Sequence, residues 1–283
     1  MNNILACIDA SIYATSIIDY SAWAAKRLEA EIEILHVIQR KDAVAARHDL
    51  SGAVGLGAKS ALMDELVKID EAEGKLAQEQ GRALLAAAKA HLESAGFTAF
   101  KLTHRHGGIV ETIVEREADA DLLIIGKRGA SANFAKGHLG SKVERVVRQS
   151  TKPVLVASRA FAEPATAIIA FDGGASSRKA VSFAATSPLF ADIAIHIVMA
   201  GREEGSYRDS MNWARTLFND RTDATFVIAD GKPEDVIAGE ISTSGANMLV
   251  MGAYGHSPLR SMLVGSTTTE IIRSSMLPVL LFR

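Results

Sequence analysis

Short apolar runs separated by amphipathic stretches form the dominant pattern of this 283-residue chain. The runs are rich in β-branched residues, and apolar residues recur at helical spacing between them, which predicts an alternation of strands and helices. Strands of this kind form a parallel sheet whose two faces are both covered by helices. The pattern therefore predicts an α/β fold.

The whole pattern occurs twice along the chain. Each half begins with an apolar run that ends in an aspartate, Asp9 in ILACID and Asp172 in AIIAFD. Each half ends with a proline and a last apolar strand, KPVLVAS in the first and LPVLLFR in the second. The order β-α-β-α-β-α-β-α-β is expected in each half. The repeat predicts two domains, residues 1–160 and 161–283, with a junction near 158–164.

The first half carries an insertion within residues 40–96. Glycines at positions 52, 55 and 57 follow no clear strand, so a loop is expected there rather than a dinucleotide-binding fingerprint. The charged stretch that follows predicts a long helix that ends near Gly96. Its counterpart in the second half is short, RDSMNWARTLF. The apolar face of the long helix is expected to consist of Leu66, Ile69, Leu76, Leu84, Ala88 and Leu92.

Composition limits the class of protein. Apolar residues make up 48% and charged residues 23%, which is typical of globular domains. The formal net charge of −2 lacks the basic balance of nucleic-acid-binding proteins, and no apolar run approaches the roughly 20 residues of a membrane span. The N-terminus lacks a signal peptide's basic region, and the single cysteine, Cys7, is expected as a small buried strand residue. We expect a cytoplasmic protein without nucleic-acid or membrane partners.

Ligands of open parallel sheets bind outside the carboxyl ends of the strands. The residues just after strands are therefore the first candidates for binding. A carboxylate at the end of strand one can accept from ribose hydroxyls or an adenine edge, although it can also cap the following helix. The candidates are Asp9 and Asp172 after strand one, Val37 and Ile197 after the strand-two histidines, and Gly126 and Gly252 at the end of strand four.

A glycine-rich loop follows strand four in both halves. Gly-x-x-Gly is followed by nine or ten residues and then by Gly-Ser, which opens the next helix. Glycines allow close backbone approach, and a helix N-terminus offers unpaired N–H groups to phosphate. A simple turn and helix cap would use the same residue types, but the recurrence favours phosphate binding. The residues are Gly126, Gly129, Gly140 and Ser141 in the first half and Gly252, Gly255, Gly265, Ser266, Thr267 and Thr268 in the second.

Catalytic motifs are not evident in the sequence. It contains no P-loop, no His-Glu-x-x-His and no nucleophile elbow. His36 and His196 lie within predicted strands and are expected to be structural. His104 and His106 lack the further ligands that zinc requires. We therefore expect no catalytic residues and no metal site built by the protein.

The strand-one aspartate, the Gly-x2-Gly-x9-Gly-Ser/Thr sequence and the proline-led last strand together resemble the universal stress protein family over nearly the whole chain. The resemblance implies two tandem adenine-nucleotide-binding, Rossmann-like domains, each with a five-stranded parallel sheet flanked by helices. It implies ATP or a related adenine nucleotide as ligand, with Mg²⁺ accompanying the phosphates, held by the aspartate, the backbone after strand two and the glycine-hydroxyl loop. It also implies that the last strands pair within the chain, and it leaves a homodimer open.

The second half matches the family's spacing better than the first. Nine residues separate Gly255 from Gly265, whereas ten separate Gly129 from Gly140. The first half also lacks the second hydroxyl that Thr268 supplies in the second. In the first half Lys142 follows Ser141, and its side chain either contacts a phosphate or remains solvated. The second domain is therefore expected to be the more reliable site.

These features predict an ATP-binding stress-response or regulatory protein. Two alternatives stay open. One is a slow ATP hydrolase or another nucleotide-processing enzyme on the same fold. The other is a pairing module in which the first site has decayed.

Overall fold

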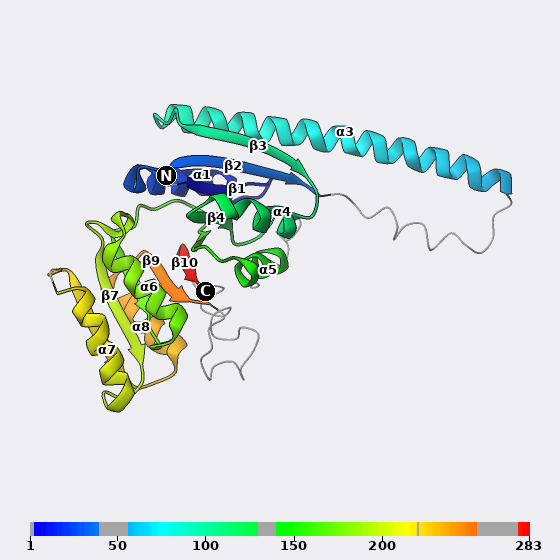
Figure 1. The fold of residues 1–283 in the computed structure, drawn as a ribbon. Coiled ribbons are helices and arrows are strands. Elements are labelled where there is room, and N and C mark those ends of the chain that lie inside the picture. The colour runs from blue at the N-terminus through cyan, green and yellow to red at the C-terminus, as the bar shows by residue number, and fades with distance from the viewer. Residues whose placement is uncertain (1–2, 40–55, 130–139, 220, 254–276) are drawn as a thin grey trace.

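The computed structural model describes residues 3–39, 56–129, 140–219, 221–253 and 277–283, and within 56–64 it describes only the helix. The first half alternates strands with helices as the apolar pattern predicts (Figure 1). Its elements are β1 (Asn3–Cys7), α1 (Ala14–Leu28), β2 (Glu31–Ile38), α3 (Leu56–Ser94), β3 (Phe100–His106), α4 (Ile109–Arg116), β4 (Leu122–Gly126), α5 (Ser141–Gln149) and β5 (Val154–Ala157).

The second half repeats this order as far as its fourth strand, and its last strand is also described. Its described elements are β6 (Thr166–Ala170), α6 (Ala175–Thr186), β7 (Ala194–Ala200), α7 (Gly205–Leu217), β8 (Ala224–Ala229), α8 (Pro233–Ser244), β9 (Met248–Gly252) and β10 (Val279–Phe282).

Local sequence explains where individual helices begin and end, and α8 is the clearest case. Pro233 occupies the first helical turn, where its missing N–H costs nothing, and Glu234 and Asp235 place negative charge at the positive end of the helix dipole. Gly245 ends the helix with a left-handed φ of 67° and donates its N–H to the Ile241 carbonyl.

The strands form one ten-stranded sheet in the order β3-β2-β1-β4-β5-β10-β9-β6-β7-β8. Neighbouring strands within each half are parallel. The two halves meet where β5 and β10 pair antiparallel, with Leu155 opposite Leu280. The α/β fold with parallel sheets is confirmed, and the last strands pair within the chain as expected. This pairing covers an edge that each half would otherwise expose.

Side chains of each strand alternate between two apolar layers. Ile4 and Ala6 belong to the layer under α1, α3, α6 and α7, whereas Leu5 belongs to the layer under α4, α5 and α8. Where helices cover both faces, a charged side chain inside a strand has no solvent-facing side. A charge within such a strand must therefore find a partner in the protein.

Helix α3 is 39 residues long, and its first part extends beyond the sheet (Figure 1). From Gly81 onward it packs on the sheet, and Ala88 and Leu92 are buried. Ile69 and Leu76 are about half exposed, so the predicted apolar face contacts the sheet only in its second part. The structure also corrects the expected loop, because Gly57 lies within α3; the other two glycines of that stretch lie outside the described residues.

None of the helices in the described part of the chain has both the length and the apolar character needed to cross a membrane. Cys7, expected to be buried, is partly covered at the end of β1. Burial, together with the carboxylates of Glu33 and Glu117, raises the pKa of its thiol. The thiolate that reacts with electrophiles is therefore disfavoured at neutral pH.

Candidate functional site

The carboxyl ends of the parallel strands place the two predicted aspartates at equivalent positions. Asp9 follows β1 by two residues, and Asp172 follows β6 by two residues. The backbone N–H of Ile8 bonds the Leu35 carbonyl at 2.9 Å, and that of Phe171 bonds the Val198 carbonyl at 2.9 Å. Each aspartate therefore lies just beyond the last bond between strands one and two of its half.

This register corrects the prediction for Ile197. β7 continues to Ala200, so Ile197 lies inside the strand, fully buried and opposite Ile169. Continuing the register places Asp9 level with Val37, near the end of β2, and Asp172 level with Ala200. The prediction treated His36 and His196 as equivalent positions of strand two. They are not equivalent, because His196 lies opposite Ile168 within β6, whereas His36 lies level with Ile8, beyond the end of β1. The equal spacings from Asp9 to Val37 and from Asp172 to Ala200 are the signal that points to Ala200.

In the first half, Asp9 and the turn after β4 meet closely. One Asp9 carboxylate oxygen accepts the Ser11 N–H at 3.1 Å, and the other lies 3.0 Å from where a Cβ on Gly129 would stand. A Cβ on Gly126 would lie 2.7 Å from the Cβ of Tyr13. Both glycines are therefore needed for close approach between this turn and the β1–α1 segment.

The N-terminus of α5 returns to the same turn. The Gly140 N–H donates to the Lys127 carbonyl at 3.1 Å, and Ser141 is the exposed first residue of the helix. Gly140, not Ser141, is the N-cap residue, and no side chain caps this helix. Lys142 donates to the Gln39 side chain at 2.5 Å, which connects α5 to the end of β2. The structure thus brings together all six predicted residues of the first half along one edge.

Two cations within this edge were missed by the sequence reasoning. Lys127 and Arg128 separate the glycines of the turn and are both partly buried. Burial, with the nearby Arg128 charge, lowers the pKa of Lys127 to about 8. The matching positions of the second half hold alanine and tyrosine. The two basic residues within the sequence Gly-Lys-Arg-Gly could have indicated this positive charge.

In the second half, Asp172 and Gly252 meet through helix α6. Asp172 accepts the Gly174 N–H at 2.8 Å and the Ser177 hydroxyl at 2.5 Å. A Cβ on Gly252 would lie 2.8 Å from the backbone nitrogen of Ser177. Asp172 therefore holds the start of α6 through these two bonds, although Gly174 and not Asp172 is the N-cap residue of this helix. The remaining predicted residues of this site lie outside the described residues: Gly255, Gly265, Ser266, Thr267 and Thr268.

The histidines make contacts within the fold. The Nδ1–H group of His36 donates to the Ile8 carbonyl at 2.9 Å, and the His36 and His104 rings lie 5.3 Å apart. The His196 Nδ1 atom lies 3.4 Å from a carboxylate oxygen of Glu240. Within the described ranges, no three histidine, cysteine or acidic side chains are grouped so that they could hold a metal ion.

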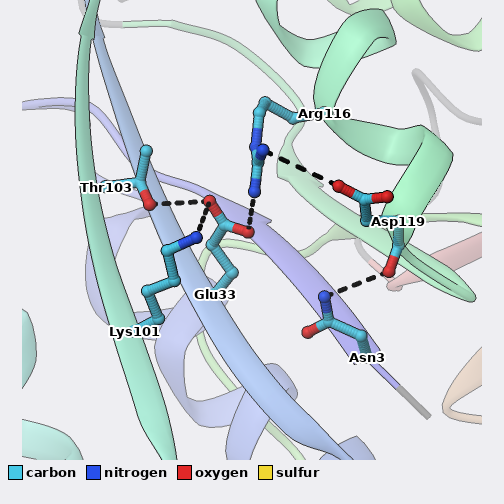
Figure 2. Close-up of polar contacts among 6 residues, drawn as sticks. All are labelled: Asn3, Glu33, Lys101, Thr103, Arg116 and Asp119. Atoms are coloured by element: carbon cyan, nitrogen blue, oxygen red, sulfur yellow. Dashed lines mark hydrogen bonds and ion pairs between the residues drawn. The ribbon is translucent and has the colours of Figure 1, made fainter. Parts of the chain in front are cut away.

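A buried polar cluster lies beneath α4, inside the sheet rather than at its carboxyl edge (Figure 2). Glu33 of β2 accepts from Arg116 at 2.6 Å and from Thr103 at 2.6 Å, and the Lys101 ammonium lies 4.0 Å away. Burial alone would raise the pKa of Glu33, but the hydrogen bonds from Arg116 and Thr103 outweigh it and lower that pKa. These charges neutralise one another within the protein, so we assign the cluster a structural role.

Comparisons with known proteins agree with this architecture. The sequence profile of the universal stress protein family matches residues 1–158 and 200–283. The universal stress protein Slr1230 of Synechocystis is 34% identical over the full length of both chains. A universal stress protein structure from Archaeoglobus fulgidus aligns with a TM-score of 0.73 at 19% identity, covering 100% of this chain and 96% of its own. A functionally unknown protein from Pseudomonas aeruginosa aligns with a TM-score of 0.65 at 17% identity, covering 100% and 92%. The chain therefore belongs to the universal stress protein family.

Proposed function

We propose that this protein binds an adenine nucleotide, ATP or a close relative, at the carboxyl edge of its sheet and acts as a stress-response regulator. The observation that carries the proposal is the meeting of Asp9, the Gly126–Gly129 turn and the N-terminus of α5. A carboxylate, close-approach glycines and a helix N-terminus supply the groups that a nucleoside and its phosphates need.

Each group has a distinct role in this proposal. The Asp9 carboxylate accepts from the ribose hydroxyls, and the backbone near Val37 borders the base. The N–H groups that begin α5, with the Ser141 hydroxyl, donate to phosphate oxygens. Lys127 and Arg128 add positive charge beside them. Mg²⁺ would enter with the phosphates, and no side chain is assigned to it.

The corresponding site of the second half is proposed on Asp172, Gly252, Gly255, Gly265, Ser266, Thr267 and Thr268, with Ala200 in place of Ile197. The boundaries 1–160 and 161–283 are proposed for the two domains. The cations of the turn after β4 favour the first domain, whereas the hydroxyl run favours the second. Two sites of different character are therefore expected in one chain.

The test uses the symmetry of the two halves. Nucleotide released from purified protein is identified by mass spectrometry, and ATP is titrated calorimetrically into wild type, Gly129→Val, Gly255→Val and the double variant. A Cβ on Gly129 would already lie 3.0 Å from Asp9, so valine fills the space beside it. We expect two sites in wild type, one in each single variant and none in the double variant.

The control is Gly239→Val on α8, where a Cβ meets no atom within 4 Å. It should leave both sites intact. Unchanged stoichiometry and affinity in the double variant would refute the proposed site. Multiple-turnover phosphate release in the same samples with Mg²⁺ would instead favour the hydrolase alternative.

A further inference from the structure

A cavity of about 550 Å³ that is open to solvent lies where the two halves meet, and no nucleotide-binding residue predicted within the described ranges lines it. One wall is helix α6. A second wall is the segment 151–153, which precedes β5 in the first half, and the third is the end of β10. Its volume falls within the range of small-molecule sites in proteins. Because both halves contribute walls, an occupant would contact both at once.

Part of the cavity is apolar and aromatic. Phe183 of α6 and Phe282 of β10 line it, with ring centroids 5.1 Å apart at an angle of 54°. Phe282 is almost fully buried, so its position is fixed by the core. These rings offer a surface suited to a flat apolar group.

The remainder of the cavity is strongly cationic. Among the described residues that line it none is an aspartate or a glutamate, and Ser182 adds a hydroxyl. An anion there would meet several positive charges. The cations that line it are Lys152, Arg178, Lys179 and Arg283.

Several of these groups are held in place by other contacts. The Arg178 Nε atom donates to the Gly173 carbonyl at 2.9 Å, and its guanidinium lies 4.3 Å from the centroid of the Trp213 ring. Lys179 donates to the main-chain oxygen of Arg283 at 2.8 Å. The Thr151 N–H donates to buried Glu117 at 2.8 Å, which fixes the opposite wall. A positioned set of donors loses little freedom when a ligand binds.

We propose that this cavity binds a small organic anion that carries a flat apolar group, and that this ligand bridges the two halves. The anionic group lies among Lys152, Lys179 and Ser182, and the apolar group lies against Phe183 and Phe282. The ligand stabilises the arrangement in which β5 and β10 are paired, because it contacts the elements on both sides of that pair.

The probe for the test is 8-anilinonaphthalene-1-sulfonate, a flat aromatic anion, titrated by fluorescence into the full chain. Its neutral analogue N-phenyl-1-naphthylamine has the same rings without the sulfonate. We expect the anion to bind with a stoichiometry of one and to bind roughly tenfold more tightly than the neutral analogue, as a charge-assisted contact provides. Lys152→Glu and Lys179→Glu should each weaken the anion's binding by roughly tenfold.

Lys75→Glu on the exposed part of α3 is the matched control and should leave binding unchanged. Circular dichroism and the melting temperature establish that each variant is folded. Equal binding of the two probes, or unchanged affinity in both cavity variants, would overturn the proposal. Equal weakening by Lys75→Glu would do the same, because it would assign the effect to overall charge.

Discussion

Arg116 donates to Glu33 at 2.6 Å in the first half, and the same strand-to-helix contact recurs in the second half with its polarity reversed. Glu33 lies opposite Leu5 on β1, and His196 lies opposite Ile168 at the matching position of β6. There the strand supplies the imidazole, and Glu240 of α8 supplies the acid at 3.4 Å. A polar contact between strand two and the last turns of the helix after strand three is thus common to both halves, whereas the side chains that make it differ.

Removing one partner of the Glu33–Arg116 pair should be costly. Arg116→Met leaves the Glu33 carboxylate, whose side chain is 4% exposed, without its main counter-charge. We expect a loss of about 3–5 kcal/mol in the free energy of unfolding, measured by urea denaturation followed by circular dichroism. The double variant Glu33→Met/Arg116→Met should recover much of this loss, because no buried charge remains.

Lys101→Met is the control for this pair. Its ammonium lies 4.0 Å from Glu33 but is 66% exposed, so a change below about 1 kcal/mol is expected. A double variant as unstable as the sum of its singles would show that the two side chains do not act as a pair.

The Glu33–Arg116 pair also predicts that the free energy of unfolding depends on pH. The lowered pKa of Glu33 means that its contribution is fully present at neutral pH and is lost as pH falls through the folded-state pKa. The stability difference between wild type and Glu33→Gln should therefore be large at pH 7 and should shrink below about pH 4, where the ordinary glutamate pKa lies. Urea midpoints at pH 7, 5 and 3 measure it. A difference that stays constant from pH 7 to pH 3 contradicts the assigned ion pair.

The alternation of strands and helices could be predicted because burial on both sheet faces forces apolar strands between amphipathic helices. The glycines of the turn after β4 could also be found, since only glycine admits Asp9 and Tyr13 so closely. Glu33 was overlooked because the strand was identified by its apolar residues alone. In a sheet covered on both faces, that acid was itself a signal of a buried partner.

The pattern of apolar and polar residues could not predict contacts between residues that are distant in sequence. Ile197 was misplaced because a repeated histidine looked like a repeated register, whereas strand register is set by backbone bonds. Similarly, helical spacing placed Ile69 and Leu76 on one face of α3 but could not show that the sheet ends before it reaches them. Periodicity identifies a face of a helix, and only the three-dimensional structure shows what covers it.

Two glycines of α3 should respond in opposite ways to alanine. A Cβ on Gly81 would lie 2.4 Å from the His104 Nε2 atom and 2.9 Å from the His36 ring. We expect Gly81→Ala to destabilise the fold by about 1–3 kcal/mol, because overpacking outweighs the helix-propensity gain of about 1 kcal/mol. Gly74→Ala meets no atom within 4 Å and should stabilise by about 0.5–1 kcal/mol. Thermal unfolding of both variants measures this, and shifts of the same sign would disprove the close packing at Gly81.

Lys127 predicts how nucleotide affinity changes with pH if the proposed site is correct. Burial lowers its pKa to about 8, so the side chain is cationic at pH 7 and mostly neutral at pH 9. Loss of that charge beside the phosphates should weaken ATP binding roughly tenfold between these two pH values. The measurement is calorimetry in a Gly255→Val background, which leaves only the first site.

Two substitutions separate Lys127 from other titrating groups. Lys127→Arg keeps its charge at both pH values and should bind ATP with nearly the same affinity at pH 7 and pH 9. Lys127→Met should bind weakly at both. If Lys127→Met retains the wild-type pH profile, another group causes the dependence and Lys127 does not contact the phosphates. If Lys127→Met binds ATP as tightly as wild type at pH 7, the turn after β4 does not hold the phosphates. That conclusion would stand even if Gly129→Val abolishes ATP binding.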